Sequence, residues 1–146
     1  MSSTRKTIIA KRVQYAALPY RVSRGSRTEV MLVTSRETRR WIIPKGWPHK
    51  GKTPHRSAAR EAFEEAGVVG AIRRRSVGSF SYEKRLKSGS VVECEVRVFA
   101  LEVKRQQKDW PERKQRQFKW LSANAAARAV QEPMLGKIIR RLARDD

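Results

Sequence analysis

Apolar and polar positions alternate in two regions of the chain, and each region predicts a β-hairpin. Residues 13–22 and 28–35 are rich in β-branched and aromatic side chains, and the turn-forming sequence SRGSR separates them. Residues 71–85 and 91–104 flank a second turn, LKSGS. In the last of these strands, apolar side chains on one face alternate strictly with polar ones on the other: Val92, Cys94, Val96, Val98 and Ala100 against Glu93, Glu95 and Arg97.

The segment between the two hairpins has the pattern of a helix. Thr53 can cap a helix whose first residue is Pro54, and Gly67 stands where a left-handed C-terminal cap is expected. The helix should therefore span about residues 54–66. At about 100° per residue, two opposite sides form. We expect the first side to face the core and the second to carry a carboxylate cluster: Ala58, Ala59, Ala62, Phe63 and Ala66 against Glu61, Glu64 and Glu65.

Shorter patterns complete the predicted architecture. An apolar run at 41–43 is stopped by Pro44, and a loop at 45–52 follows it. A mobile basic loop at 106–116 leads to a strand at 118–121. The chain then forms an alanine-rich helix, which Ser122 caps and Pro133 interrupts, and an amphipathic helical segment at 134–144. Strands, helix, strands and helices in this order predict an α/β fold with a mixed sheet covered by helices. We expect a flexible basic terminus at 1–11 and a single domain at 12–146.

Chain length, cysteine content and the length of apolar runs indicate the number of domains and the cellular location. The 146 residues are enough for one ordinary domain. Cys94 is the only cysteine, so no internal disulfide can form, and we expect a reducing, cytoplasmic location. No apolar run approaches the roughly 18 residues needed to span a bilayer, so we expect no membrane partner. The N-terminal sequence MSSTRKTIIAKR also resembles an organelle transit peptide, but a frayed basic end leading into the first strand is the simpler interpretation.

The net charge of the chain indicates which classes of molecule it can bind. The chain has 34 Lys and Arg against 14 Asp and Glu, a formal net charge of +20, and a sequence pI near 11.3. Such a field favours polyanions, which include nucleic acid, anionic lipid and phosphate-rich small molecules. The sequence lacks the interleaved aromatic motifs of an RNA-recognition sheet, so nucleic acid is not the favoured partner. The sequence leaves the oligomeric state open.

Three of the scarce acids are crowded on one helix, at Glu61, Glu64 and Glu65. Like charges at these spacings cost roughly 0.2–0.5 kcal/mol per pair. With the unfavourable dipole the total is about 1–2 kcal/mol, which a domain of roughly 5–15 kcal/mol stability tolerates. An exposed acidic stripe paired with Arg56 or Arg60 therefore remains open. Carboxylates one turn apart can also bind Mg²⁺, and the preceding glycine loop can add backbone groups.

A longer pattern surrounds these acids. Gly46, five residues, Lys52, seven residues and then REAFEEAGV resemble the Nudix box of the Nudix hydrolases, which has a glutamate at the Lys52 position and a bulkier aliphatic residue at the Ala62 position. The segments RRWIIPKG, VVGAIRRRSVGSF and DWPERKQRQFKWL resemble the diphosphoinositol polyphosphate phosphohydrolase branch. The resemblance covers about residues 12–130 and implies a Nudix-type α/β/α sandwich with a mixed sheet.

The resemblance also implies a metal site. Glu64 and Glu65 would bind Mg²⁺, or alternatively Mn²⁺, with help from a main-chain carbonyl of Lys45 or Gly46. Glu61 would be a further ligand or the base that takes a proton from the attacking water. Because Lys52 replaces a carboxylate at the rim, either the number of ions or the salt bridge that steadies the loop should differ from the family pattern.

Other residues receive roles from the same resemblance. Arg60 would hold Glu61 or its neighbours in place, which makes Arg60, Glu61 and Glu64 the expected catalytic group. The expected phosphate-binding residues are Arg40, Lys45, Arg85 and Arg113. Further expectations concern Glu112 and, less strongly, Glu95 as extra metal ligands, Trp47 and Trp110 as base-stacking or loop-packing residues, and His49 and His55 as residues without a ligand role.

The resulting functional hypothesis is a metal-dependent pyrophosphohydrolase. Its substrate would be a diphosphoinositol polyphosphate or a dinucleoside polyphosphate. A hydrolase of nucleoside polyphosphates or RNA 5′ ends would share the same helix and differ only in loops. A nucleic-acid-binding module with an inactive box is the alternative from another class.

Overall fold

Two long strands form the centre of the sheet. The computed structural model describes residues 8–144. Strand β1 (Ile8–Ser23) pairs with β2 (Arg27–Thr34) in an antiparallel hairpin and with β7 (Val91–Gln106) in parallel. The sheet is therefore mixed, as the order of elements predicts.

The remaining strands extend this centre on both sides. They are β3 (Trp41–Ile42), β4 (Lys45–Gly46), β5 (Val68–Ile72), β6 (Gly78–Arg85) and β8 (Phe118–Ser122). β3 and β8 pair with β2, β4 pairs with β1, and β5 and β6 pair with successive parts of β7. Helix α1 thus lies in the chain between β4, which flanks β1, and β5, which flanks β7.

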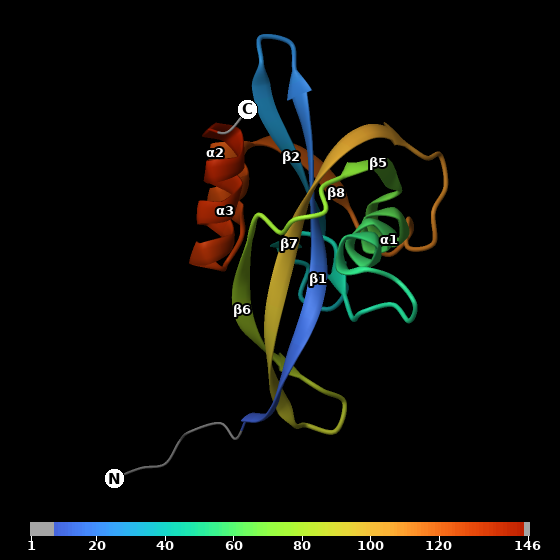
Figure 1. Cartoon of the computed structure of the whole chain (residues 1–146), viewed down its shortest axis with the longest axis vertical. Coiled ribbons are helices and arrows are strands. Elements are labelled where there is room, and N and C mark those ends of the chain that lie inside the picture. Colours follow the sequence, from blue (N-terminus) through green and yellow to red (C-terminus); the bar gives the residue numbers. More distant parts are fainter. Residues whose placement is uncertain (1–7, 145–146) are drawn as a thin grey trace.

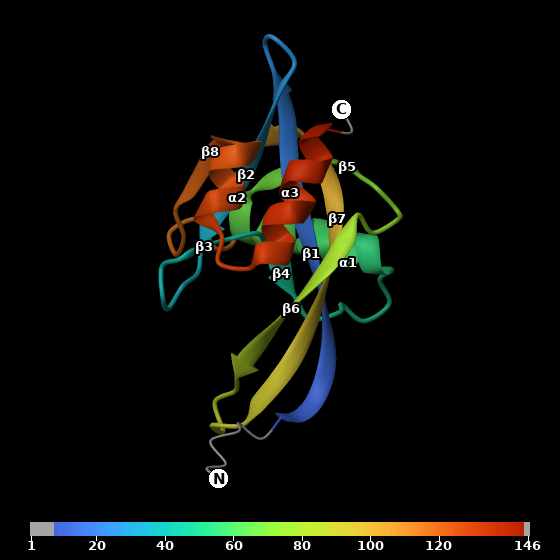
Figure 2. The ribbon, with the colours of Figure 1, turned by 90° about the vertical axis from the view of Figure 1, so that its left-hand side faces the viewer.

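Helices cover both faces of the sheet. Helix α1 (Pro54–Ala66) lies on one face, and α2 (Ala123–Ala129) and α3 (Pro133–Arg144) lie on the other (Figures 1 and 2). This three-layer arrangement confirms the predicted α/β/α sandwich. None of the helices within residues 8–144 has the length and apolar character needed to cross a bilayer.

Alternate residues of the central strands enter two separate cores. Leu18 of β1 packs in the core under α2 and α3, whereas its neighbour Ala17 packs in the core under α1. In β2, Leu32 packs in the core under α2 and α3, and Met31 packs in the core under α1. Side chains of a strand alternate between the faces of a sheet, so a sheet covered on both faces requires consecutive apolar residues. This requirement explains the uninterrupted run VMLV in β2.

Several predicted boundaries differ from the structure. β1 begins at Ile8, so the strand includes part of the segment expected to be a flexible terminus, and residues 1–7 lie outside the described residues. The strand expected at 71–85 is two strands, because residues 73–77 leave the regular ladder between β5 and β6. The loop expected at 45–52 starts later, because Lys45 and Gly46 pair with β1. The hairpins and the caps of α1 lie where the sequence predicts them.

Candidate active site

Local signals fix the helix that carries the acids. Thr53 is the N-cap residue, although its side chain makes no capping hydrogen bond, and its carbonyl accepts the N–H of Ser57. Pro54 occupies the first helical position, where its missing N–H costs nothing. Gly67 adopts a left-handed φ of 72° and donates its N–H to the carbonyl of Phe63.

The buried side of α1 differs from the predicted one. It contains Ser57, Ala58, Glu61, Ala62, Glu65 and Ala66. The exposed fractions of Glu61 and Glu65 are only 9% and 4%, whereas Ala59 and Phe63 are half-buried. The expectation that all three glutamates lie opposite the core was therefore wrong for two of them. The reason is the local environment, because basic side chains and a glycine, instead of apolar side chains, face Glu61 and Glu65.

Gly46 makes room for Glu61. A Cβ atom built on Gly46 would overlap the carboxylate of Glu61. The backbone of β4 can therefore approach α1 closely only because residue 46 has no side chain. Pairing of Gly46 with Tyr15 of β1 holds this approach in place.

His49 also reaches Glu61, which the sequence did not predict. The distance between His49 Nε2 and Glu61 Oε2 is 2.6 Å. The backbone N–H of His49 donates to Ser57 Oγ at 3.0 Å, which ties the loop to α1. Single donor atoms of His49, Glu61 and Glu64 all lie within 4.8 Å of one another. Lys52, which stands at the glutamate position of the box, is exposed.

Glu65 is the most deeply buried acid of α1. Burial raises its pKa well above the usual range, and the hydrogen bond and charge of Glu61 add to the shift, while Arg116 and Lys45 oppose it. Arg116 Nη2 lies 3.8 Å from Glu65 Oε1. This oxygen has no hydrogen-bond partner among the described residues. Glu65 therefore carries an unsatisfied acceptor, which is a costly feature of a protein interior.

Glu64 has a different environment on the outer side of α1. Its Oε2 accepts a hydrogen bond from Arg60 Nε at 2.7 Å, one helical turn away. Arg60 thus contacts a neighbour of Glu61, in line with one of the two roles expected for it. The exposed fraction of the Glu64 side chain is 25%, so solvent and ligands can reach it.

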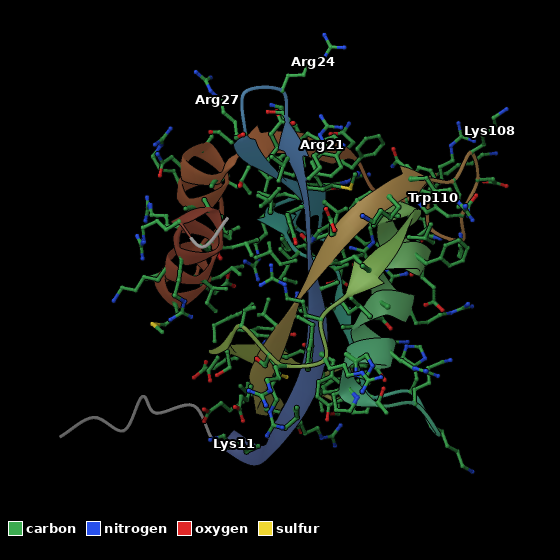
Figure 3. The ribbon with its side chains drawn as sticks, turned by 45° about the horizontal axis from the view of Figure 1, so that its top comes forward. Lys11, Arg21, Arg24, Arg27, Lys108 and Trp110 are labelled. Carbon is green, nitrogen blue, oxygen red and sulfur yellow. The ribbon has the colours of Figure 1, made fainter. Side chains whose placement is uncertain are left out.

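The loop expected to be mobile is anchored on α1. The N–H of Glu112 donates to the carbonyl of Glu64, and the N–H of Gln107 donates to the carbonyl of Gly67. The ring of Trp110 lies over Gly67, where a Cβ atom would overlap it, and Figure 3 shows Trp110 beside α1. These contacts correct the sequence-based expectation. Lys108, in the same loop, points away from the body of the protein (Figure 3).

The expected extra metal ligands are both paired with arginine. Glu112 Oε1 accepts a hydrogen bond from Arg116 Nε at 2.8 Å. Since Arg116 also attracts Glu65, the three side chains form a chain of contacts from the loop to α1, with Glu112 at its partly exposed end. Glu95 on β7 lies 3.8 Å from Arg97, and 30% of its side chain is exposed.

The expected phosphate-binding residues lie in different surroundings. Arg40 Nη1 forms an ion pair with Glu132 Oε2 at 3.0 Å. Lys45 lies near Arg40 and Glu65, and burial lowers the pKa of Lys45 to about 8, with Arg40 and Lys84 adding to the effect and Glu65 and Glu132 opposing it. Arg85 lies at the end of β6 and donates to the carbonyl of Gly89 within its own turn.

Arg113 lines a groove next to Arg116. The groove has a volume of about 460 Å³ and is lined by Trp41, Trp110, Arg113, Arg116, Gln117, Phe118 and Lys119. The rings of Trp110 and Phe118 meet edge to face, with centroids 6.2 Å apart. Through Arg116 this aromatic groove adjoins the carboxylate of Glu65. Trp47, in the loop before α1, is exposed and lies under the guanidinium of Arg12 instead.

The donors of this site fit a divalent cation. Glu61, Glu64 and Glu65 offer carboxylate oxygens, and no hydrogen-bond donor in the described part of the chain reaches Oε1 of Glu65. Hard cations prefer such oxygens. The surrounding basic side chains can attract a phosphate chain to the same place.

Sequence comparison identifies the domain. A family model described as the NUDIX domain matches residues 14–142. "Nudix hydrolase 12, mitochondrial" of Arabidopsis thaliana is 33% identical over 132 residues, which cover 79% of this chain and 64% of that protein. "Diphosphoinositol polyphosphate phosphohydrolase 3-beta" of Bos taurus is 31% identical over 119 residues, which cover 78% of this chain and 68% of that protein. The chain spans less than two thirds of the length of Nudix hydrolases 12, 13 and 16 of Arabidopsis thaliana.

Solved structures share the fold. The C. elegans Ap4A hydrolase superposes with a TM-score of 0.63 at 19% identity, covering 89% of this chain and 94% of that chain. The E. coli dihydroneopterin triphosphate pyrophosphohydrolase gives 0.67 at 17% identity, covering 92% and 96%. Because the NUDIX family model matches residues 14–142 and the plant and bovine relatives are more than 30% identical, the chain belongs to the Nudix domain family.

Proposed function

We propose that this chain is a metal-dependent pyrophosphohydrolase that cleaves a phosphoanhydride bond in a highly anionic substrate. The observation that carries the proposal is the buried carboxylate of Glu65, which lies beside Glu61 and whose Oε1 has no hydrogen-bond partner within residues 8–144. Membership of the Nudix family supports hydrolysis as the reaction type. The nearby excess of Lys and Arg supports an anionic substrate.

The residues of α1 would have different roles in the reaction. Glu61, Glu64 and Glu65 would hold Mg²⁺ or Mn²⁺, with help from the main-chain carbonyl of Lys45 or Gly46. When bound, such an ion acidifies a water molecule and offsets the charge of the phosphate oxygens. Glu61 would alternatively act as the base that takes a proton from the attacking water. Arg60 orients the Glu64 carboxylate through their 2.7 Å contact.

Basic side chains would hold the rest of the substrate. Lys45, with a pKa of about 8, is largely protonated at pH 7 and lies on the inner side of the site. Arg40 has the planar guanidinium that suits phosphate, but a ligand must compete there with Glu132. Arg113 and Arg85 are the further phosphate contacts of the proposal.

The aromatic groove favours one of the two substrates. Trp41, Trp110 and Phe118 line it, and Arg116 links it to Glu65. A nucleobase stacks on aromatic side chains, whereas an inositol ring has no π-face to offer. Of the two candidates, a dinucleoside polyphosphate therefore fits the groove better than a diphosphoinositol polyphosphate. We retain the cytoplasm as the proposed location, since Cys94 is buried as a free thiol.

A hydrolysis panel tests the proposal. Inositol pyrophosphates, diadenosine polyphosphates, nucleoside triphosphates and 5′-triphosphorylated RNA would be incubated with Mg²⁺ or Mn²⁺, and the products separated. We expect metal-dependent cleavage that Glu64→Gln lowers by at least about 100-fold. Glu29→Gln is the matched control, because Glu29 accepts from Arg21 Nε at 2.8 Å and has a similar exposed fraction, 29%.

Two results would contradict the proposal. Turnover that survives Glu64→Gln would remove the role given to α1. Absence of turnover combined with salt-sensitive RNA binding that is equal in wild type and Glu64→Gln would favour the nucleic-acid-binding alternative.

A further inference from the structure

One nitrogen donor stands among the carboxylates of α1. His49 comes from the loop before the helix, and its Nε2 lies 2.6 Å from Glu61 Oε2. Donor atoms of His49, Glu61 and Glu64 lie within 4.8 Å of one another, a span that one ion can bridge. His49 is not one of the box positions that carry the family resemblance. Its place in this cluster is a property of this chain's own loop.

A second observation points to a ligand at the same place. Glu65 is 4% exposed, and its Oε1 has no hydrogen-bond partner among the residues that the structure describes. Glu61 precedes Glu65 by one helical turn, so the two carboxylates lie on the same side of α1. Glu65 therefore lies beside the group formed by His49, Glu61 and Glu64, and its Oε1 is 3.8 Å from Arg116 Nη2. Polar atoms buried without a partner are rare in native proteins, and an ion is one of the species that satisfies them.

Two hydrogen bonds of its own backbone groups hold His49 in position. The N–H of His49 donates to Ser57 Oγ at 3.0 Å, and Ser57 is fully buried in α1. The carbonyl of His49 accepts the N–H of Lys52 at 3.0 Å, which closes a tight turn. Lys52 is exposed, so the residue that replaces the glutamate of the box points to solvent while His49 faces the acids.

We propose that His49 is a metal ligand and that its imidazole shifts the preference of the site from Mg²⁺ toward Mn²⁺ and related transition-metal ions. Imidazole suits first-row transition metals, whereas Mg²⁺ prefers oxygen ligands and keeps its water. Binding requires the neutral ring with a free Nε2. The inference rests on the proposed function, since it needs an ion at Glu61 and Glu64, and adds a ligand and a selectivity to it.

Pulsed electron paramagnetic resonance of Mn²⁺ tests this assignment directly. The tag-free chain would be loaded with less than one equivalent of MnCl₂, and the electron spin echo would be examined for ¹⁴N modulation from a bound imidazole. We expect ¹⁴N modulation in the wild type. Labelling the wild type with ¹⁵N-histidine should replace it by the ¹⁵N pattern, a test that needs no substitution.

Two histidine variants identify the residue. His49→Gln should lose the ¹⁴N modulation and bind Mn²⁺ at least about 10-fold more weakly, with a smaller change for Mg²⁺ measured by competition. His55→Gln is the matched control, because His55 lies in the first turn of α1 outside the cluster. It should behave as the wild type. Circular dichroism would verify that both variants are folded.

The possible failures are distinct. Mn²⁺ that binds the wild type without nitrogen coupling would overturn the role of His49 and leave the proposed metal site standing. A wild-type chain that binds no Mn²⁺ and no Mg²⁺ would overturn the proposed function itself. Nitrogen coupling that persists in His49→Gln would also exclude His49 as the ligand.

Discussion

Arg116 Nη2 lies 3.8 Å from Glu65 Oε1, near enough for charge attraction but too far for a hydrogen bond. Arg116 instead donates to Glu112 at 2.8 Å and to the carbonyl of Thr34 at 3.0 Å. Glu65 is therefore the member of this chain of contacts that the protein leaves incompletely satisfied. Stability and metal binding should consequently oppose each other at this residue.

Glu65→Gln should stabilise the metal-free chain at high pH. Burial raises the pKa of Glu65, so the stability that its protonated form contributes is present below the unfolded pKa and is lost as pH rises through the folded pKa. Gln removes the buried negative charge that raises the pKa, and we expect the variant to gain about 1 kcal/mol at pH 8 but nothing below pH about 4. Denaturant unfolding with a chelator measures this difference. Glu29→Gln should show no such gain, and an equal loss at every pH in Glu65→Gln would contradict the interpretation.

Lys45 should impose a second pH dependence, at alkaline pH. Burial lowers its pKa to about 8 from 10.5, so between these values the unfolded chain binds more protons than the folded one. Wild-type stability should therefore rise with pH across this window, by roughly 1–2 kcal/mol after solvent screening. Lys45→Met should remove the rise, whereas Lys52→Met, at an exposed position, should keep it. Urea unfolding at pH 7.5, 9 and 10 distinguishes the two variants.

Gly46→Ala should damage the site through Glu61. The added Cβ would overlap the Glu61 carboxylate, and overpacking of this kind costs about 1–3 kcal/mol. We expect weaker Mn²⁺ binding by about 10-fold or more, measured by calorimetry. Gly136→Ala in α3, where the new Cβ would meet Ala127, should leave Mn²⁺ affinity unchanged. Partial recovery of folding stability in Gly46→Ala with Glu61→Ala would locate the clash at the carboxylate.

Phe118→Ala should separate the two substrate classes. Its ring is 43% exposed and lines the aromatic groove, so its loss should affect a stacked base more than the fold. Base–aromatic stacking is worth about 1–3 kcal/mol, and we expect KM for a dinucleoside polyphosphate to rise by at least about 5-fold. KM for a diphosphoinositol polyphosphate should not change. Met134→Ala, at an apolar position of α3 that is 50% exposed, is the control, and equal effects on both substrates would argue against stacking.

The sequence predicted those parts of the site that depend on local signals. Pro54 and Gly67 mark the ends of α1 by their backbone chemistry alone, and the structure confirms both positions. The alternation in β7 likewise follows from the period of a strand, and Cys94 and Val96 are fully buried as expected. Such features need no knowledge of what the element packs against.

Burial of Glu65 could not be inferred in this way. Helical periodicity places polar residues outside, and only the tertiary approach of Arg116, 51 positions later in the chain, makes an interior site tolerable for the carboxylate. His49 was missed for a similar reason, since its direction depends on a hydrogen bond from the loop to Ser57. The break between β5 and β6 depends on β7 offering successive partners, which a local pattern does not contain.

The parallel pairing of β1 with β7 also governs how the chain folds. Ala17 lies opposite Phe99, roughly 80 residues later in the sequence. During synthesis, β1 and its hairpin partner emerge long before the strand that completes the centre of the sheet. The edge of β1 must therefore remain unpaired until the second half of the chain has left the ribosome. Substitutions in β7 should accordingly reduce the yield of folded protein in cells more than their equilibrium effect on stability suggests.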